Sequence, residues 1–221
     1  MESFLKLNRR HFTALPLGLW AQGHWSSAKA QTPNAQVWLV VGDSLSAEYG
    51  LRRGSGWVAL LAQRLAQQAP GVQVVNASVS GDTTAGGLSR LPNLLRLHQP
   101  KVLVVELGGN DALRGLPLES TRNNLARMAQ LGRAAGAQVL LVGMQMPPNY
   151  GARYAQDFAN LFAAVARAEK TGLVPFLLQG IADSDGAERW FQADRIHPNE
   201  SAHPRMLDNV WPELRKLLPK R

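Results

Sequence analysis

Short unbroken runs of apolar residues alternate along this chain with longer stretches in which apolar residues recur every three or four positions. The short runs are typical of buried strands, and the longer spacing is typical of helices with one face on a core. The predicted strands cover residues 37–41, 72–76, 101–107, 139–142 and 173–177. The predicted helices cover residues 57–68, 88–99, 118–135, 152–170 and 202–218, with Ser55 as the N-cap of the first and a kink or break at Pro212 in the last.

The alternation of strands and helices predicts one α/β domain. The run from Val102 to Val105 is apolar at every position, which indicates a strand buried on both faces and therefore a parallel sheet. Right-handed crossovers between such strands place helices on both faces of the sheet. We expect a flavodoxin-like, three-layer α/β/α fold with a five-stranded parallel sheet. The sequence after residue 31 contains neither a linker nor an internal repeat, so residues 31–221 are predicted to form a single domain.

Residues 1–30 have the three parts of an export signal. Lys6, Arg9 and Arg10 are basic, residues 12–20 are moderately apolar, and Ala28-Lys29-Ala30 matches a cleavage pattern. The arginine pair also resembles a twin-arginine motif. The apolar stretch is too short and too interrupted to span a bilayer. We therefore expect export by a cleaved signal and a periplasmic or secreted enzyme; the alternative is an N-terminal tail that happens to contain two arginines.

Composition narrows the possible chemistry. The chain has 221 residues and no cysteine, which excludes disulfides, a thiolate nucleophile and cysteine-based metal sites. Four of its 24 basic and one of its 16 acidic residues lie in 1–30, so the formal charge falls from +8 to +5 without them. The basic residues are scattered, which favours a solvated surface over nucleic-acid binding. Neither metal-ligand spacing nor a nucleotide-binding motif occurs, so we expect no metal and no cofactor.

Four polar turns lie at strand ends or in the loop before the last helix. Ser44 follows the first predicted strand, Gly81 the second and Asn110 the third, while Asp194 and His197 precede the last helix. The carboxyl ends of parallel strands meet at one edge of a sheet, and ligands bind at that edge in open α/β sheets. The first three turns are therefore expected to lie close together.

The residues in these turns are those that nucleophilic catalysis requires. A serine hydroxyl is a weak nucleophile and needs a base within hydrogen-bond distance, for which His197 is the candidate. Asp194, three residues earlier, can accept the Nδ1 proton and orient the ring. Attack on a carbonyl also needs donors for the oxyanion. The backbone N–H groups of Ser44 and Gly81 and the side-chain amide of Asn110 are the candidate donors.

These residues lie in four sequence blocks that resemble those of the SGNH, or GDSL-type, hydrolases. The blocks are Gly42-Asp43-Ser44-Leu45, Ser80-Gly81-Asp82, Gly108-Gly109-Asn110-Asp111 and Asp194-Arg195-Ile196-His197-Pro198. The resemblance implies that Ser44 is the nucleophile, His197 the base and Asp194 its partner. It implies that Gly81 and Asn110 are oxyanion donors. Longer stretches resemble the bacterial periplasmic branch described as acyl-CoA thioesterase, arylesterase and lysophospholipase, which implies hydrolysis of acyl esters and thioesters. They are residues 42–50, 76–83, 90–92, 106–111, 113–115 and 148–151.

Several other residues have weaker indications. Met146, Pro147 and Tyr150 lie in a loop rich in methionine and proline, where they line an acyl pocket or simply pack the loop. Asp82 and Asp111 are expected to brace loops through local hydrogen bonds. His203 is expected on the surface of the last helix.

Alternatives to an acyl esterase stay open at this point. A carbohydrate O-deacetylase would use the same residues on a different substrate. A non-catalytic flavodoxin-like binding module would share only the fold, because a fold does not fix a function. A charged surface that binds lipid or nucleic acid is a third class. We expect a monomer acting on a small acyl ester, thioester or lysophospholipid, without nucleic acid and without stable membrane insertion.

Overall fold

A computed structural model describes residues 35–219, and the predicted export signal over residues 1–30 lies outside them. Five parallel strands form one sheet in the order β2-β1-β3-β4-β5. The strands are β1 (Gln36–Gly42), β2 (Val72–Asn76), β3 (Val102–Glu106), β4 (Gln138–Val142) and β5 (Gly172–Val174). The predicted five-stranded parallel sheet is confirmed, although β5 ends three residues earlier than predicted.

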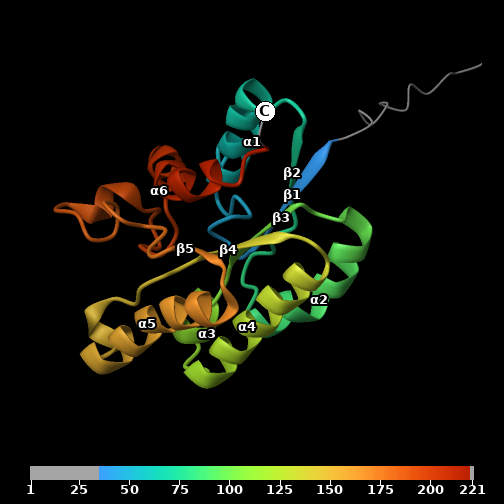
Figure 1. The fold of residues 1–221 in the computed structure, drawn as a ribbon. Coiled ribbons are helices and arrows are strands. Elements are labelled where there is room, and N and C mark those ends of the chain that lie inside the picture. Colours follow the sequence, from blue (N-terminus) through green and yellow to red (C-terminus); the bar gives the residue numbers. More distant parts are fainter. Residues whose placement is uncertain (1–34, 220–221) are drawn as a thin grey trace, which may run out of the picture. The chain divides into compact units, whose positions relative to one another are not determined.

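Helices cover both faces of the sheet and complete the three predicted layers (Figure 1). One face packs α1 (Trp57–Gln68) and α6 (His203–Arg215), and the other packs α2 (Thr84–His98), α4 (Leu118–Ala134) and α5 (Ala152–Glu169). Trp38 and Val40 of β1 point into the first layer, whereas Leu39 and Val41 point into the second. This alternation follows from the two-residue period of a strand and explains why the whole run is apolar.

The sheet order places β1 between β2 and β3, so the loops that follow these three strands lie next to one another. β1 pairs with both β2 and β3, and Gly42 at its carboxyl end lies beside Glu106 at the end of β3. The loop after β2 is held there as well, because the Val79 N–H donates to the Gly42 carbonyl at 3.0 Å. The turns that follow the first three strands therefore begin at one edge of the sheet, as the sequence predicts.

The last predicted helix is present as α6, and the break considered at Pro212 does not occur, because α6 continues through this residue. Proline removes one backbone donor and strains the preceding turn. The helix nevertheless buries Met206, Val210 and Leu214 against the sheet, on both sides of the proline. Apolar packing along this face stabilises the helix more than one missing hydrogen bond destabilises it.

The beginning of α1 corrects two further predictions. The N-cap is Gly56, which offers no side-chain acceptor, and the Ser55 hydroxyl instead donates to the Arg52 carbonyl. The first helical N–H, that of Trp57, donates to His203 Nδ1 at 3.0 Å. His203 is therefore buried, with 1% of its surface exposed, and the prediction of a surface residue is wrong. Its ring satisfies a donor that a helix start leaves unpaired.

No helix among the described residues is both long enough and apolar enough to cross a bilayer.

Candidate active site

The turn after β1 presents Ser44 at the edge of the sheet. β1 ends at Gly42, where a Cβ atom would lie 2.8 Å from both Glu106 Oε2 and Ser46 Oγ, so only glycine fits. The next residue, Asp43, is buried, and its Oδ1 accepts the Leu45 N–H at 3.0 Å. Ser44 remains partly exposed, and its Oγ lies 2.9 Å from His197 Nε2.

His197 belongs to the long loop between β5 and α6, and Asp194 orients its ring. Asp194 Oδ1 accepts the backbone N–H groups of Ile196 and His197, while Oδ2 lies 2.7 Å from His197 Nδ1. Partial burial raises the pKa of Asp194, but hydrogen bonds from His197 and Ile196 outweigh it and lower the pKa to about 2. The carboxylate is therefore charged at neutral pH. It favours the tautomer in which Nδ1 carries the proton and Nε2 faces Ser44.

Gly81 lies in the loop between β2 and α2 with a backbone φ of +78°, which favours glycine. Within the part of the chain that the structure describes, the N–H groups of Ser44 and Gly81 donate to no other backbone carbonyl, whereas the nearby Ser46 and Asp82 N–H groups do. The Gly81 carbonyl points elsewhere, because it accepts from Arg114 Nη2 at 2.8 Å. Both N–H groups therefore stay available to a ligand.

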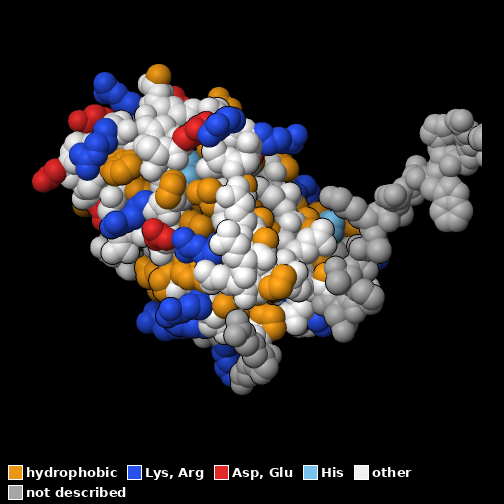
Figure 2. Space-filling view, turned by 90° about the horizontal axis from the view of Figure 1, so that it is seen from above, with side chains coloured by type: hydrophobic (Ala, Val, Ile, Leu, Met, Phe, Trp, Pro, Cys, Tyr) orange, Lys and Arg blue, Asp and Glu red, His pale blue; other side chains and the backbone are white. Residues whose placement is uncertain are grey.

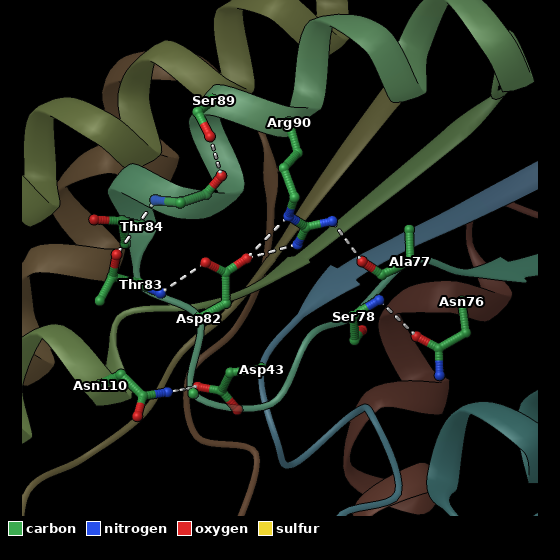
Figure 3. Close-up of polar contacts among 12 residues, drawn as sticks. Asp43, Asn76, Ala77, Ser78, Asp82, Thr83, Thr84, Ser89, Arg90 and Asn110 are labelled. Atoms are coloured by element: carbon green, nitrogen blue, oxygen red, sulfur yellow. Dashed lines mark hydrogen bonds and ion pairs between the residues drawn. The ribbon is translucent and has the colours of Figure 1, made fainter.

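Asn110 lies in the short helix α3 (Gly109–Leu113) and turns its amide towards Asp43 in the turn after β1 (Figure 3). Its Nδ2 donates to Asp43 Oδ2 at 3.0 Å. A primary amide carries two N–H donors, so the second is free for an oxyanion. Burial raises the pKa of Asp43 to about 6, so the carboxyl is mostly charged at neutral pH and accepts this bond. The sequence predicts Asn110 as a donor, but it gives no sign that Asp43 orients it.

An arginine holds the loop that contains Gly81. Arg90 of α2 donates from Nε and Nη2 to Asp82 Oδ2, at 3.2 and 2.6 Å, and from Nη1 to the Ala77 carbonyl at 2.8 Å. Figure 3 shows this guanidinium spanning the two ends of the loop. Asp82 also accepts the Thr83 N–H, so it braces the loop as predicted. The other predicted brace, Asp111, accepts the N–H and hydroxyl of Thr84 at the start of α2.

Residues 40–205 match the GDSL-like lipase/acylhydrolase family. The chain belongs to this family. The match spans all four sequence blocks, so the predicted resemblance is confirmed.

This GDSL-like hydrolase is 55% identical to esterase TesA of Pseudomonas aeruginosa over 188 aligned residues. The alignment covers 85% of this chain and 92% of the relative. It is 40% identical over 184 residues to thioesterase 1/protease 1/lysophospholipase L1 of Escherichia coli K12, covering 83% of this chain and 86% of the relative. A crystal structure of TesA matches with a TM-score of 0.79 and 56% identity, over 83% of this chain and 100% of that one. The chain is therefore a hydrolase of ester bonds, which disfavours the binding-module alternative.

The three predicted substrate-binding residues of the hydrolase lie in different environments. Met146 is buried in the apolar layer that also contains Phe158. Pro147 is exposed, and Tyr150, in the short helix η1 (Pro148–Tyr150), is 42% exposed. Only the last two can therefore meet a substrate without rearrangement of the loop.

Sequence reasoning missed one buried carboxyl that contacts the turn after β1. Glu106 has no exposed surface, and its Oε2 accepts the Ser46 hydroxyl at 2.7 Å. The same hydroxyl accepts from Trp57 Nε1 at 3.2 Å. Burial is the main reason why the pKa of Glu106 lies well above its usual value. A single acidic residue at the end of an otherwise apolar strand was the available signal.

Proposed function

We propose that the enzyme hydrolyses carboxylic esters and thioesters of acyl substrates through an acyl-enzyme on Ser44. The observation that carries this proposal is one continuous set of contacts. Asp194 Oδ2 lies 2.7 Å from His197 Nδ1, and His197 Nε2 lies 2.9 Å from Ser44 Oγ. The three side chains come from positions as far as 153 residues apart, and this arrangement is that of a nucleophile, a base and an orienting acid.

In the first half of the reaction His197 Nε2 accepts the Ser44 proton as Oγ attacks the acyl carbonyl. The new oxyanion is held by the Ser44 and Gly81 N–H groups and by the free N–H of the Asn110 amide. Each such donor typically lowers the barrier by about 3–4 kcal/mol. Asp194 stabilises the imidazolium. When the C–O or C–S bond breaks, His197 returns the proton to the leaving oxygen or sulfur.

In the second half a water molecule replaces the leaving group. His197 Nε2 accepts a proton from this water as its oxygen attacks the acyl carbonyl, and the oxyanion forms at the same donors. Collapse breaks the bond to Ser44 Oγ, which regains the proton from His197. The products are a free acid and the original enzyme. Of the described residues, these steps use only Ser44, Gly81, Asn110, Asp194 and His197.

The acyl group is proposed to be of medium or long chain length. The P. aeruginosa relative is named an esterase, and the E. coli relative is named a thioesterase and a lysophospholipase. Exposed Pro147 and Tyr150 support an apolar acyl path after β4. A carbohydrate O-deacetylase would instead prefer acetyl groups. A series of p-nitrophenyl esters from acetate to palmitate separates the two, because kcat/KM rises with length for the first and falls for the second.

Replacement of the nucleophile tests the proposed reaction. Ser44→Ala is expected to abolish both the burst of p-nitrophenol and labelling by a fluorophosphonate, because both need the Oγ atom. Ser89→Ala removes an exposed hydroxyl on α2 that donates only to the Gly86 carbonyl, and it should label like the parent. Full activity of Ser44→Ala would contradict the proposal.

We further propose that the mature enzyme is a periplasmic or secreted monomer. The support is the three-part signal pattern in residues 1–30. A small acyl ester is proposed as its only partner, because the reaction needs no cofactor and no second macromolecule.

A further inference from the structure

One exposed aromatic side chain lies against the His197 imidazole, and a second exposed apolar residue directly precedes His197 in the chain. Tyr49 is 49% exposed, yet its ring packs on His197 with centroids 4.4 Å apart and planes tilted by 41°. Ile196, the residue before His197, is 52% exposed. Burial of a large apolar side chain is favourable, so an exposed ring packed on a reacting group suggests a contact that the free enzyme lacks.

The backbone before each of these side chains is strained. Glu48, directly before Tyr49, has a φ of 61°, and Arg195, directly before Ile196, has a φ of 59°. The other two non-glycine residues with positive φ among those described, Gln99 and Lys170, are ordinary left-handed helix C-caps. Left-handed backbone costs about 1–2 kcal/mol in a non-glycine residue and concentrates at functional sites.

Hydrogen bonds fix the strained turn of Tyr49 and join it to the loop of His197. The Glu48 carboxylate accepts the N–H groups of Gly54 and Gly56 at 2.9–3.1 Å. Gln192 Nε2 donates both to the Tyr49 carbonyl at 2.9 Å and to the Pro198 carbonyl at 3.0 Å. The Gln192 N–H donates to the His197 carbonyl at 2.8 Å. The tyrosine and the imidazole are therefore held in one geometry before a substrate arrives.

The position of Tyr49 assigns it to one half of the substrate. His197 must deliver its proton to the leaving oxygen, so the leaving group passes beside the imidazole, whereas the acyl carbonyl oxygen faces Gly81 and Asn110. We propose that Tyr49, together with Ile196 directly before His197, forms a leaving-group subsite that selects flat, apolar leaving groups, namely aryl alcohols. An aryl ring can stack on the exposed part of Tyr49 while the C–O bond breaks and the phenol oxygen takes the His197 proton. This assignment rests on the proposed acyl-enzyme reaction.

The test compares two esters of the same acid, phenyl butanoate and ethyl butanoate. For each variant, kcat/KM is divided by the parent value on the same ester, so the different reactivities of the esters cancel. Tyr49→Ala is expected to lose about tenfold on the phenyl ester, the size of an aromatic contact, and less than twofold on the ethyl ester. Tyr49→Phe keeps the ring and should match the parent on both esters. Leu97→Ala removes the 68%-exposed leucine of α2, away from the catalytic loops, as a surface control.

Ile196→Ala should act in the same direction as Tyr49→Ala and more weakly, because it removes fewer contact atoms. Equal losses on both esters in Tyr49→Ala, or a shift of its pH–rate profile, would show that the ring only supports His197 and would overturn the subsite. Unchanged rates on both esters would overturn it as well. Full activity in Ser44→Ala would instead refute the acyl-enzyme, so the two failures are distinguishable.

Discussion

Glu106 and His203 are buried ionisable side chains, and in both burial disfavours the charged form. Burial raises the pKa of Glu106 well above its usual value, and only one of its carboxyl oxygens has a hydrogen-bond partner among the described residues. Burial lowers the pKa of His203 to about 4. Neutral forms suit their contacts, because His203 Nδ1 accepts the Trp57 N–H and so cannot carry a proton.

His203 makes a pH-dependent contribution to stability. Its pKa is about 4 in the folded state against 6.5 for an ordinary histidine, so the unfolded chain binds more protons between these values. The free energy of unfolding should therefore fall as the pH falls from 6.5 to 4, by about 2–3 kcal/mol for this residue. Urea unfolding at pH 7.5 and 4.5 should show His203→Gln less stable than the parent at pH 7.5, with the difference shrinking or reversing at pH 4.5.

The difference in unfolding free energy between the parent and His203→Gln separates the titration of His203 from that of Asp43. Burial raises the pKa of Asp43 to about 6, which favours the folded state as the pH falls below that value and opposes the effect of His203. Asp43 is present in both chains, so its contribution cancels in the difference. An equal stability difference at both pH values would show that His203 does not titrate in this range.

At the scale of elements, Arg90 of α2 is expected to place an oxyanion donor without touching the substrate. Its contacts to Asp82 and to the Ala77 carbonyl hold the loop that contains Gly81. Arg90→Ala should lower kcat by about 10- to 100-fold and change KM by less than threefold, because the Gly81 N–H acts mainly on the transition state. Arg90→Lys should recover part of the loss.

Steady-state kinetics on phenyl butanoate provide the measurement, and Arg96→Ala provides the control. Arg96 lies on the same helix and contacts Asn93 instead of the loop. If Arg90→Ala melts at a lower temperature but keeps its kcat, the contacts of Arg90 stabilise the fold without setting the position of the Gly81 N–H, and the prediction is wrong.

Elements with a clear hydrophobic period could be predicted from the sequence, and those held by distant polar partners could not. The apolar runs located all five strands, and three-to-four spacing located the long helices. The five-residue helix α3 has no such period. It is fixed by Asp111, whose carboxylate binds Thr84, 27 residues earlier. The break predicted at Pro212 in the last helix does not occur for a related reason, since the burial of Leu214 beyond the proline continues the helix.

The candidate site divides in the same way. Ser44, Gly81 and Asn110 follow adjacent strands, so sheet topology alone brings them to one edge. His197 and Asp194 were predicted from their chemistry and spacing, and the structure places His197 in contact with Ser44 and Asp194 in contact with His197. Tyr49 gave no signal, because its role depends on a ring 148 positions later in the chain. The role of a residue whose partner lies far along the chain can be recognised only from the folded structure.

At the scale of the whole molecule, basic side chains are spread over the surface. Figure 2 shows Lys and Arg side chains interleaved with apolar ones on the viewed face, with no single basic band. Several arginines are also paired with acidic groups, as Arg64 is with Asp208 at 3.1 Å. The face viewed in Figure 2 therefore lacks the continuous basic stripe that is expected of a nucleic-acid contact.

The uneven distribution of charge along the chain leads to a prediction about the fate of the full-length protein. Residues 1–30 carry four basic and one acidic residue, including the Arg9-Arg10 pair. We expect cleavage after the Ala28-Lys29-Ala30 pattern when the full chain is expressed in an exporting bacterium. Mass spectrometry of the periplasmic fraction should then find the intact mass of a chain that begins at Gln31.

The export route can be resolved with two matched double variants. Arg9→Lys with Arg10→Lys keeps the charge of the signal but removes the guanidinium pair, and it should retain the protein in the cytoplasm if a twin-arginine receptor reads that pair. Arg52→Lys with Arg53→Lys changes the other adjacent arginine pair, which lies exposed in the folded domain, and it should be exported like the parent. Export of both variants at parental levels would assign the signal to a route that reads charge and apolar length, and retention of the parent itself would contradict the signal altogether.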